Sequence, residues 1–325
     1  MTPGTREDLS GLRAALVARL GDERVGRNVP LGPFTTFKVG GPADLFVEPR
    51  SSEEIVDVLR LAAAHSVPVT LLGGGSNVLV ADAGVRGLVV RQRGGHIERI
   101  DVNRVRADAA VTINGLVRWL VGHGLAGLEA WAGTPGTVGG GIYGNAHWGG
   151  RLLSEFIESV RLARPGAAAV VDVPVSEMGF GYDRSRLQTS GEVVLSAVFV
   201  VRDGTPDALR ETARASLAYR KRTQPLASPS AGCIFQNPGP SVSLPDGIPR
   251  SAGALVDRAG LKDLKIGGAI VSPAHGNFIV NMGVATATDI RRLIERCRAV
   301  VRDRFGVILE DEIVYLGQFE SGSED

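Results

Sequence analysis

The chain has 325 residues, more than one small core requires, and this length predicts two or three domains. Its 36 basic and 35 acidic side chains leave a net charge of +1, so no overall field favours nucleic acid or an anionic membrane. The two cysteines make no disulfide framework, and no apolar run approaches the roughly 20 residues of a membrane span. The chain does not start with a basic segment followed by an apolar one. We therefore expect a cytoplasmic monomer without nucleic-acid or membrane partners.

In chain order, the spacing of apolar and turn residues predicts that helices and strands alternate through the first third of the chain. A peripheral helix is expected at 9–20, and a capping box at 51–54 begins a second helix that ends near His65. Strands are expected at 44–47, 67–72 and 87–91, with an apolar segment at 78–80 between the last two. This order is typical of a βαβ-like unit.

Five residues at 73–77, Gly-Gly-Gly-Ser-Asn, follow one of these strands. Backbone N–H groups in such a turn can converge on an anionic oxygen. The dinucleotide-binding fingerprint requires a Gly-x-Gly-x-x-Gly turn that opens a helix, whereas residue 78 is valine and no helical pattern follows. We predict a phosphate-binding turn outside the Rossmann class; a plain hairpin turn is the alternative.

A glycine-rich segment at 127–150 is the most unusual part of the chain. Nine of its 24 residues are glycine, and they alternate with threonines and aromatic residues so that neither a helical nor a strand period runs through them. Glycine permits positive φ and lets a ligand approach the backbone. We expect a cradle for a pyrophosphate. The alternative, a flexible surface loop, would be richer in Ser, Lys and Glu and would not carry three aromatic residues.

The remaining elements follow from the same patterns. Before the glycine-rich segment we expect short strands within 96–111 and a helix at 113–123. After it we expect a hairpin of strands at 160–163 and 168–173, and a nine-residue apolar strand at 193–201. The last part predicts helices at 205–221, 251–259 and 288–305, and strands at 267–271, 275–281 and 308–316.

Six blocks, in order, resemble the UDP-N-acetylenolpyruvoylglucosamine reductase (MurB) family. They lie at 35–43, 72–80, 133–146, 231–238, 275–281 and 312–317, and the resemblance spans residues 28–317. It implies an α+β fold with a two-subdomain FAD-binding domain of the vanillyl-alcohol-oxidase (PCMH) type, followed by a smaller α+β substrate-binding domain. The expected bounds are 1–28 for an N-terminal helical extension, 29–204 for the FAD-binding domain (subdomains 29–95 and 96–204) and 205–325 for the UDP-sugar domain. The short connection between 201 and 206 leaves no room for an extra loop of one subclass, which indicates the type II form.

The function implied by the resemblance is NADPH-dependent reduction, through bound FAD, of the enolpyruvyl ether of UDP-N-acetylglucosamine. The product would be UDP-N-acetylmuramate, a peptidoglycan precursor. NADPH would reduce FAD, hydride would pass to C3 of the enolpyruvyl group, and a proton would be added at C2. The residues implied for FAD binding are Gly73, Gly74, Gly75, Ser76, Asn77, Thr134, Pro135, Gly136, Thr137, Gly140, Gly141, Gly144 and Asn145.

By the same resemblance, the proton donor is Cys233, where most relatives have serine. A thiol, with a pKa of about 8.5, is a far stronger acid than an alcohol; the alternative is a small buried residue without a chemical role. The implied acid on the last strand is Glu312, and Glu310, two positions earlier on the same strand face, is the alternative.

The third catalytic residue is harder to assign. Relatives have Phe-x-Tyr-Arg-x-Ser where this chain has Phe-Gly-Tyr-Asp-Arg-Ser at 180–185, so Asp183 takes the place of the arginine. An aspartate could not stabilise an enolate. We predict that Arg184 supplies the positive charge, with Arg186 as the alternative. His147 could act as a base, but a histidine there more often holds the loop or contacts the cofactor.

The UDP end of the substrate, UDP-N-acetylglucosamine enolpyruvate, would bind a basic cluster and several polar residues. The predicted residues are Tyr219, Arg220, Arg222, Asn237, His275 and Asn277. A solvated helix end is the alternative for the basic cluster, and bonds to backbone neighbours are the alternative for the polar side chains.

Two other functions remain open at this stage. One is a flavin-dependent oxidase of the same FAD-binding fold, because fold alone does not decide the reaction. The other is a non-catalytic protein that binds flavin and UDP-sugar, which the aspartate at position 183 would favour. No metal site is expected, since the five histidines and two cysteines do not fall at ligand spacing.

Overall fold

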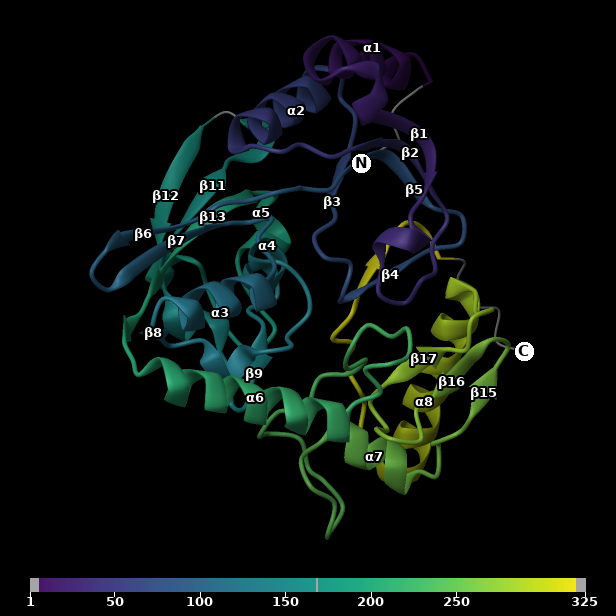
Figure 1. The fold of residues 1–325 in the computed structure, drawn as a ribbon. Helices are drawn as coiled ribbons and strands as arrows, with labels where there is room; N and C mark the ends of the chain where they lie inside the picture. Colours follow the sequence, from purple (N-terminus) through teal and green to yellow (C-terminus); the bar gives the residue numbers. More distant parts are fainter. Residues whose placement is uncertain (1–5, 168, 320–325) are drawn as a thin grey trace. The chain divides into compact units, whose positions relative to one another are not determined.

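The computed structural model describes residues 6–167 and 169–319, and the chain divides into two units (Figure 1). The first unit comprises the chain up to Val29 together with Ala43–Gly74 and Arg86–Tyr219. The second comprises Pro30–Pro42, Gly75–Val85 and the chain from Arg220 onward. The units therefore do not follow the consecutive bounds expected from the sequence, because two N-terminal segments belong to the C-terminal unit.

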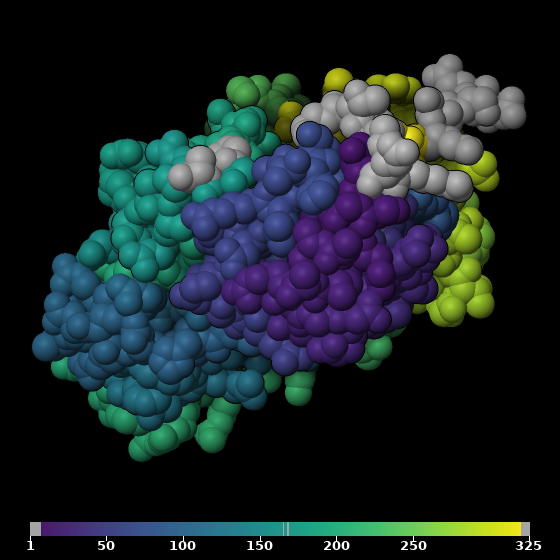
Figure 2. Space-filling view, turned by 90° about the horizontal axis from the view of Figure 1, so that it is seen from above, coloured from purple at the N-terminus to yellow at the C-terminus, as the bar shows by residue number. Residues whose placement is uncertain are grey.

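A four-stranded sheet and two helices form one end of the first unit. The sheet has the order β1-β2-β5-β3, with β3 parallel to β5, and comprises β1 (Val25–Pro30), β2 (Pro42–Val47), β5 (Val85–Val90) and β3 (Val69–Leu71). The helices α1 (Arg6–Leu20) and α2 (Ser52–Ala64) are in contact, and their surfaces adjoin in Figure 2. Leu12 and Leu16 of α1 are fully buried against the apolar side chains of this sheet and α2. The expected peripheral helix is therefore part of a core.

The larger part of the first unit is built on a five-stranded antiparallel sheet. Its order is β12-β11-β13-β7-β6, comprising β12 (Val170–Pro174), β11 (Ile157–Ala163), β13 (Val193–Val200), β7 (Arg104–Asp108) and β6 (Ile97–Asp101). Two helices, α3 (Ile113–Gly122) and α4 (Val138–Tyr143), supply buried side chains to its core, in which Trp131 is 1% exposed. Shorter elements complete the unit: β8 (Leu125–Ala126) paired with β14 (Arg202–Asp203), β9 (His147–Trp148) paired with β10 (Arg151–Leu152), and α5 (Leu187–Ser190).

A long helix, α6 (Pro206–Thr223), contributes its residues up to Tyr219 to the first unit and the rest to the second. The second unit contains a three-stranded antiparallel sheet of β15 (Lys265–Ile266), β16 (Ala269–Val271) and β17 (Ile279–Asn281). The helices α7 (Ala252–Arg258) and α8 (Ala287–Phe305) bury their apolar faces in the same core. A separate parallel pair joins β4 (Val78–Val80) to β18 (Val314–Leu316), so the turn after Gly75 is fixed to the end of the chain.

Most predicted elements are confirmed, although the strand expected at 275–281 covers only Ile279–Asn281, and two further predictions are wrong. The strand expected at 308–316 is reduced to Val314–Leu316, because Phe235 and Asp311 form only an isolated bridge before it. The glycine-rich segment contains the short helix α4, although no helical period was expected there. Thr137 caps this helix by accepting a hydrogen bond from the Gly140 N–H, and Val138 and Ile142 are buried one turn apart. No helix within residues 6–167 and 169–319 has both the length and the apolar character that a membrane crossing requires.

Candidate functional site

In the first unit, the predicted cofactor residues form two glycine segments that touch each other. A Cβ on Gly74 would lie 2.8 Å from Cα of Gly136, and a Cβ on Gly73 would lie 2.8 Å from Oγ1 of Thr137. These distances are shorter than real Cβ contacts, so the two segments can approach this closely only because residues 73 and 74 have no side chains. The sequence places these segments about 60 positions apart, and the fold brings them together.

The second glycine segment presents its backbone where α4 begins. Gly133 and Gly136 have φ of 80° and 93°, which L side chains rarely adopt. A Cβ on Gly144 would meet no atom within 4 Å, and one on Gly140 would meet only Thr137 Oγ1 at 3.4 Å. Gly141 differs, because its missing side chain faces Leu153 and Ile113 rather than open space. Open backbone at Gly140, in the first turn of α4, and at Gly144, which caps its C-terminal end, leaves room for a bound diphosphate, so this segment suits the FAD that the sequence predicts.

Asn145, by contrast, uses its side chain inside the protein. It is fully buried, its Nδ2 donates to the Gly181 carbonyl at 2.8 Å, and its Oδ1 accepts from the Ser154 N–H at 3.0 Å. Its φ of 45° is also in the left-handed region. A role for Asn145 in cofactor binding would therefore rest on its backbone.

The other half of the first glycine turn belongs to the second unit. Gly75 has φ of 63°, and a Cβ there would lie 2.1 Å from the Phe34 carbonyl oxygen. Asn77 bonds to the end of the chain: its Nδ2 donates to the Glu312 carbonyl at 3.0 Å, and its own carbonyl accepts from the Val314 N–H at 2.9 Å. This turn therefore holds the segment that carries Glu312.

Cys233 and Glu312 lie on neighbouring segments of the second unit. The Glu312 N–H donates to the Ile234 carbonyl at 2.8 Å, and the Gln236 N–H donates to the Glu310 carbonyl at 2.9 Å. The segment that follows Cys233 thus runs antiparallel to 310–312, with a bridge between Phe235 and Asp311. Both Cys233 and Glu312 are partly exposed. The structure therefore presents a thiol and a carboxyl group on adjacent stretches of chain.

Asn277 fixes the segment that begins at Cys233. Its side chain accepts from the Phe235 N–H at 2.9 Å and donates to the Phe235 carbonyl at 2.7 Å, and its carbonyl accepts from the Ile234 N–H at 2.9 Å. Asn277 is 3% exposed. Both ends of its amide are occupied by main chain, so the predicted contact with substrate is replaced by a contact that positions Cys233. The backbone-bonding alternative therefore describes this residue.

Three neighbouring carboxyl groups at 310–312 have different surroundings. Asp311 forms an ion pair with Arg298 and accepts from the Tyr315 hydroxyl at 3.2 Å. Burial and the Asp311 charge together raise the pKa of Tyr315 to about 12. Glu310 is exposed, and it does not lie on a regular strand face with Glu312 as the sequence predicted. Of the three, Glu312 alone is both half-buried and away from the ion pair with Arg298.

Arg220 is the most buried of the predicted UDP-binding cations. It is 5% exposed, and burial lowers its pKa to about 10, while the charge of Cys233 acts in the opposite direction. Such a strong perturbation beside a candidate proton donor is typical of a functional site. Arg222 and Tyr219, at the same end of α6, are exposed. Arg220 therefore lies close enough to Cys233 for their charges to interact.

Asn237 and His275 lie near the start of α7. Asn237 is exposed, and its Oδ1 accepts from the Ala252 N–H at 3.0 Å, which leaves its Nδ2 to donate. The Nδ1 of His275 accepts from the Asn277 N–H at 3.2 Å, and its ring packs edge-on against Phe278. Burial, with a smaller contribution from Lys262, lowers the pKa of His275, so the ring is neutral near pH 7.

Asp183 and its neighbours form a tight turn in the first unit. Gly181 and Arg184 exchange two backbone hydrogen bonds, of 3.0 and 3.3 Å, and Asp183 has φ of 51°. His147 Nδ1 lies 3.2 Å from an Asp183 carboxylate oxygen. Arg184 is exposed at the end of this turn. Sequence reasoning missed the His147–Asp183 pair, since no local pattern joins residues 36 positions apart.

Arg186, the alternative to Arg184, already has a carboxylate partner. Its Nε and Nη2 reach the two oxygens of Glu192 at 2.8 and 2.7 Å, and its Nη1 donates to the Glu177 carbonyl at 3.1 Å. The Glu192 side chain is 3% exposed. Moving Arg186 toward a substrate would leave a buried carboxylate without this partner, which favours Arg184.

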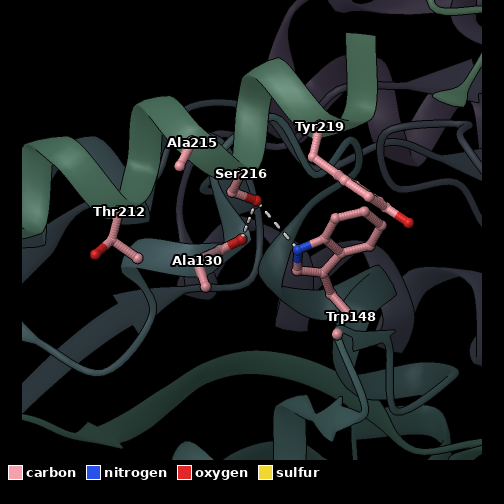
Figure 3. A pocket seen from close by; sticks show the side chains of 7 residues that line it. Ala130, Trp148, Thr212, Ala215, Ser216 and Tyr219 are labelled. Atoms are coloured by element: carbon pink, nitrogen blue, oxygen red, sulfur yellow. Dashed lines mark hydrogen bonds between the residues drawn. The ribbon is translucent and has the colours of Figure 1, made fainter. Parts of the chain in front are cut away.

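A groove of about 530 Å³ lies between α6 and the end of the glycine-rich segment (Figure 3). Trp148 Nε1 donates to Ser216 Oγ at 3.1 Å, and Ser216 in turn donates to the Ala130 carbonyl. The rings of Trp148 and Tyr219 meet edge to face at 6.1 Å between centroids. Tyr219 therefore packs against Trp148, a contact that the sequence did not predict.

Comparisons with known proteins point to the same family as the sequence motifs. A family model described as UDP-N-acetylenolpyruvoylglucosamine reductase, C-terminal domain, matches residues 224–316, and one described as FAD binding domain matches residues 43–172. A UDP-N-acetylenolpyruvoylglucosamine reductase of Bacillus velezensis is 37% identical, over 93% of this chain and 98% of the relative.

Solved structures also resemble the chain. The crystal structure of UDP-N-acetylenolpyruvylglucosamine reductase from Thermus caldophilus matches with a TM-score of 0.75 and 33% identity, over 90% of this chain and 99% of the other. A p-cresol methylhydroxylase with substrate bound matches with a TM-score of 0.53 and 12% identity, over 92% and 87% of the two chains, and this likeness concerns the fold alone. The α+β fold with an FAD-binding domain of the vanillyl-alcohol-oxidase type is thereby confirmed.

Proposed function

The chain belongs to the UDP-N-acetylenolpyruvoylglucosamine reductase family, and we propose from this premise which of its residues carry out the reaction. The protein is an FAD-dependent oxidoreductase that uses NADPH to reduce the enolpyruvyl ether of UDP-N-acetylglucosamine. The product, UDP-N-acetylmuramate, is a peptidoglycan precursor. When bound, FAD would supply the hydride chemistry of the reaction. The steps below concern the chain's own residues.

The backbone of the two glycine segments holds the FAD diphosphate in this proposal. The contact of Gly74 with Gly136, and the open backbone at Gly140 and Gly144, support it. Backbone N–H donors can bind a diphosphate without basic side chains, which suits a chain with a net charge of +1. Ser76 and Thr134 would add hydroxyl donors from the same turns.

Cys233 is the proposed proton donor. Its Sγ would transfer a proton to C2 of the substrate after hydride arrives at C3, and solvent would then return a proton to the sulfur. Glu312 would bind the substrate carboxylate through a proton that the two carboxyl groups share. The observation that carries this proposal is the bond from the Glu312 N–H to the Ile234 carbonyl, because it fixes the segments of donor and acid side by side.

Arg184 is the proposed cation for the charge that develops on the substrate carboxylate side. Its exposure, together with the engagement of Arg186 by Glu192, supports this choice. For the UDP end we propose Arg220, Arg222, Tyr219, Asn237 and His275, with Arg220 set close to Cys233. Asn277 would act indirectly, because its side chain bonds to the Phe235 backbone and so positions the segment that begins at Cys233.

We also propose a monomeric cytoplasmic enzyme of the type II form, without nucleic-acid partners. The two residues between β14 and α6 leave no room for an added loop, which supports the type II assignment. Size-exclusion chromatography with light scattering tests the oligomeric state, and a mass of about twice the 34.1 kDa of the chain would contradict it.

The experiment that tests the function uses purified protein loaded with FAD. NADPH oxidation is followed with and without the enolpyruvyl substrate, and the product is identified by mass spectrometry. Substrate-dependent NADPH oxidation with one UDP-N-acetylmuramate formed per NADPH is expected. NADPH oxidation that requires oxygen and does not depend on the enolpyruvyl substrate would instead indicate an oxidase. Binding of FAD without any turnover would indicate a binding module.

A further inference from the structure

The turn that carries Arg184 is tied to the glycine-rich segment by side chains from both sides. Asn145 donates to the Gly181 carbonyl at 2.8 Å, and Ser185 donates to the Tyr143 carbonyl at 2.6 Å. These two bonds hold the ends of the turn. Its two central residues, at 182 and 183, are held by a third and different contact.

That third contact is made by His147. Its Nδ1 lies 3.2 Å from the Asp183 carboxylate, and its ring lies against Tyr182 with 4.7 Å between centroids and an interplanar angle of 34°. The Tyr182 hydroxyl is 3.4 Å from the other ring nitrogen of His147. One imidazole thus contacts both central residues of the turn.

Asp183 carries a conformational and an electrostatic cost. Its φ of 51° is in the left-handed region, which few residues other than glycine adopt. Its side chain is 10% exposed, so the carboxylate has lost most of its contact with water. The contact with His147 offsets part of the cost of burying this carboxylate.

We propose that His147 and Asp183 are positioning residues. They fix the turn at 181–184, so that the Arg184 side chain extends from it in a single orientation. Asp183 then supports the catalytic cation rather than replacing it. The inference rests on the proposed role of Arg184. It assigns to His147 a bond to the turn instead of base catalysis, and it predicts an effect on substrate reduction but not on the reduction of FAD by NADPH.

The first test measures the turn itself, without substrate or turnover. Amide hydrogen exchange of Gly181 and Arg184 is compared in the FAD-loaded wild type, Asp183→Ala and His147→Ala. Because these two N–H groups are bonded across the turn, we expect exchange to be faster by about tenfold in both variants. The matched control is Asp172→Ala, which removes an exposed partner of Arg161 on the β11–β12 hairpin of the same unit. Wild-type exchange in Asp183→Ala would overturn the proposal.

The second test separates the two halves of the reaction by rapid mixing. In Asp183→Ala, the rate at which NADPH bleaches the flavin should stay within about twofold of wild type, whereas the rate at which saturating substrate restores its colour should fall by about tenfold to a hundredfold. Asp183→Asn keeps the shape and one acceptor oxygen, so it should recover most of this loss. Equal slowing of both halves would overturn the proposal, since it would indicate a general effect on flavin binding or folding.

The variants also distinguish this inference from the role of Arg184. Arg184→Gln should slow substrate reduction and leave the exchange of the turn unchanged. If Arg184→Gln has no effect while Asp183→Ala does, both the cation role and the positioning proposal fail. If Arg184→Gln is slow and Asp183→Ala is normal, only the positioning proposal fails. The double variant His147→Ala/Asp183→Ala should be no slower than the worse single variant by more than about threefold, because both remove the same contact.

Discussion

The backbone N–H of Glu312 donates a 2.8 Å hydrogen bond to the carbonyl of Ile234, the residue that directly follows Cys233. Asn77 fixes the same segment from the other direction, through its bond to the Glu312 carbonyl. The proposed proton donor and the proposed acid are therefore set by one hydrogen-bonded region that also includes the end of the first glycine turn. A change in any of these residues should alter the position of the others.

Replacing Asn277 tests how much this region depends on one buried amide. Asn277→Ala leaves the Phe235 N–H and carbonyl without their partners, and each unsatisfied buried group costs about 1–3 kcal/mol. We expect a free energy of unfolding lower by about 2–4 kcal/mol, measured by urea denaturation, together with reduced turnover. Asn237→Ala is the control, since Asn237 is exposed and makes a single bond to Ala252. Equal stability of the two variants would contradict the assignment.

Gly75→Ala tests the close approach of the glycine turn to Phe34. The added Cβ would lie 2.1 Å from a backbone carbonyl, and the φ of 63° adds strain. We expect a loss of more than about 2 kcal/mol in the free energy of unfolding and weaker FAD binding. Gly247→Ala is matched in φ, at 74°, but its Cβ would meet nothing within 4 Å, so it should cost only about 1 kcal/mol. Similar losses in both variants would show that the contact with Phe34 does not matter.

The ion pair between Arg24 and Glu54 predicts a pH dependence of stability. Hydrogen bonds from the Arg24 guanidinium lower the pKa of Glu54 from 4.5 to about 2. Because the folded-state pKa is lowered, this stabilisation is complete above about pH 4.5 and is lost as the pH falls toward 2. Glu54→Gln should therefore be less stable than wild type by about 1 kcal/mol at pH 6, with a difference that shrinks toward zero near pH 2. A difference that stays constant over this range would contradict the prediction.

Local patterns in the sequence were sufficient to predict many elements and several site residues. The helix start at 51–54 and the apolar spacing of α8 depend only on neighbours in sequence, and both elements are confirmed; Ser51 caps α2 by accepting from the Glu54 N–H, but the Glu54 carboxylate accepts from the Arg50 N–H, so the capping box is only half formed. The turn at 73–77 is followed by a strand rather than a helix, as the valine at 78 indicated. The six motif blocks predicted the family and its cofactor.

Other features depend on contacts between distant segments, which no local pattern encodes. Asn277 has the appearance of a substrate ligand in sequence, and only the fold shows that its amide is occupied by Phe235. The choice between Arg184 and Arg186 depends on Glu192, whose carboxylate accepts two hydrogen bonds from Arg186. The strand expected at 308–316 is shorter in the structure because residues 310–312 bond to an irregular segment that follows Cys233. The apolar alternation of 308–316 does not reveal this partner.

The central claim is that Cys233 delivers the proton in an FAD- and NADPH-dependent reduction of the enolpyruvyl substrate. The most direct measurement is turnover of FAD-loaded wild type, Cys233→Ser and Cys233→Ala with NADPH and UDP-N-acetylglucosamine enolpyruvate. The account predicts turnover by wild type, retention of activity within about tenfold in the serine variant, and a loss of about a hundredfold or more in the alanine variant, as for removal of a general acid. Wild-type turnover in Cys233→Ala would contradict the account.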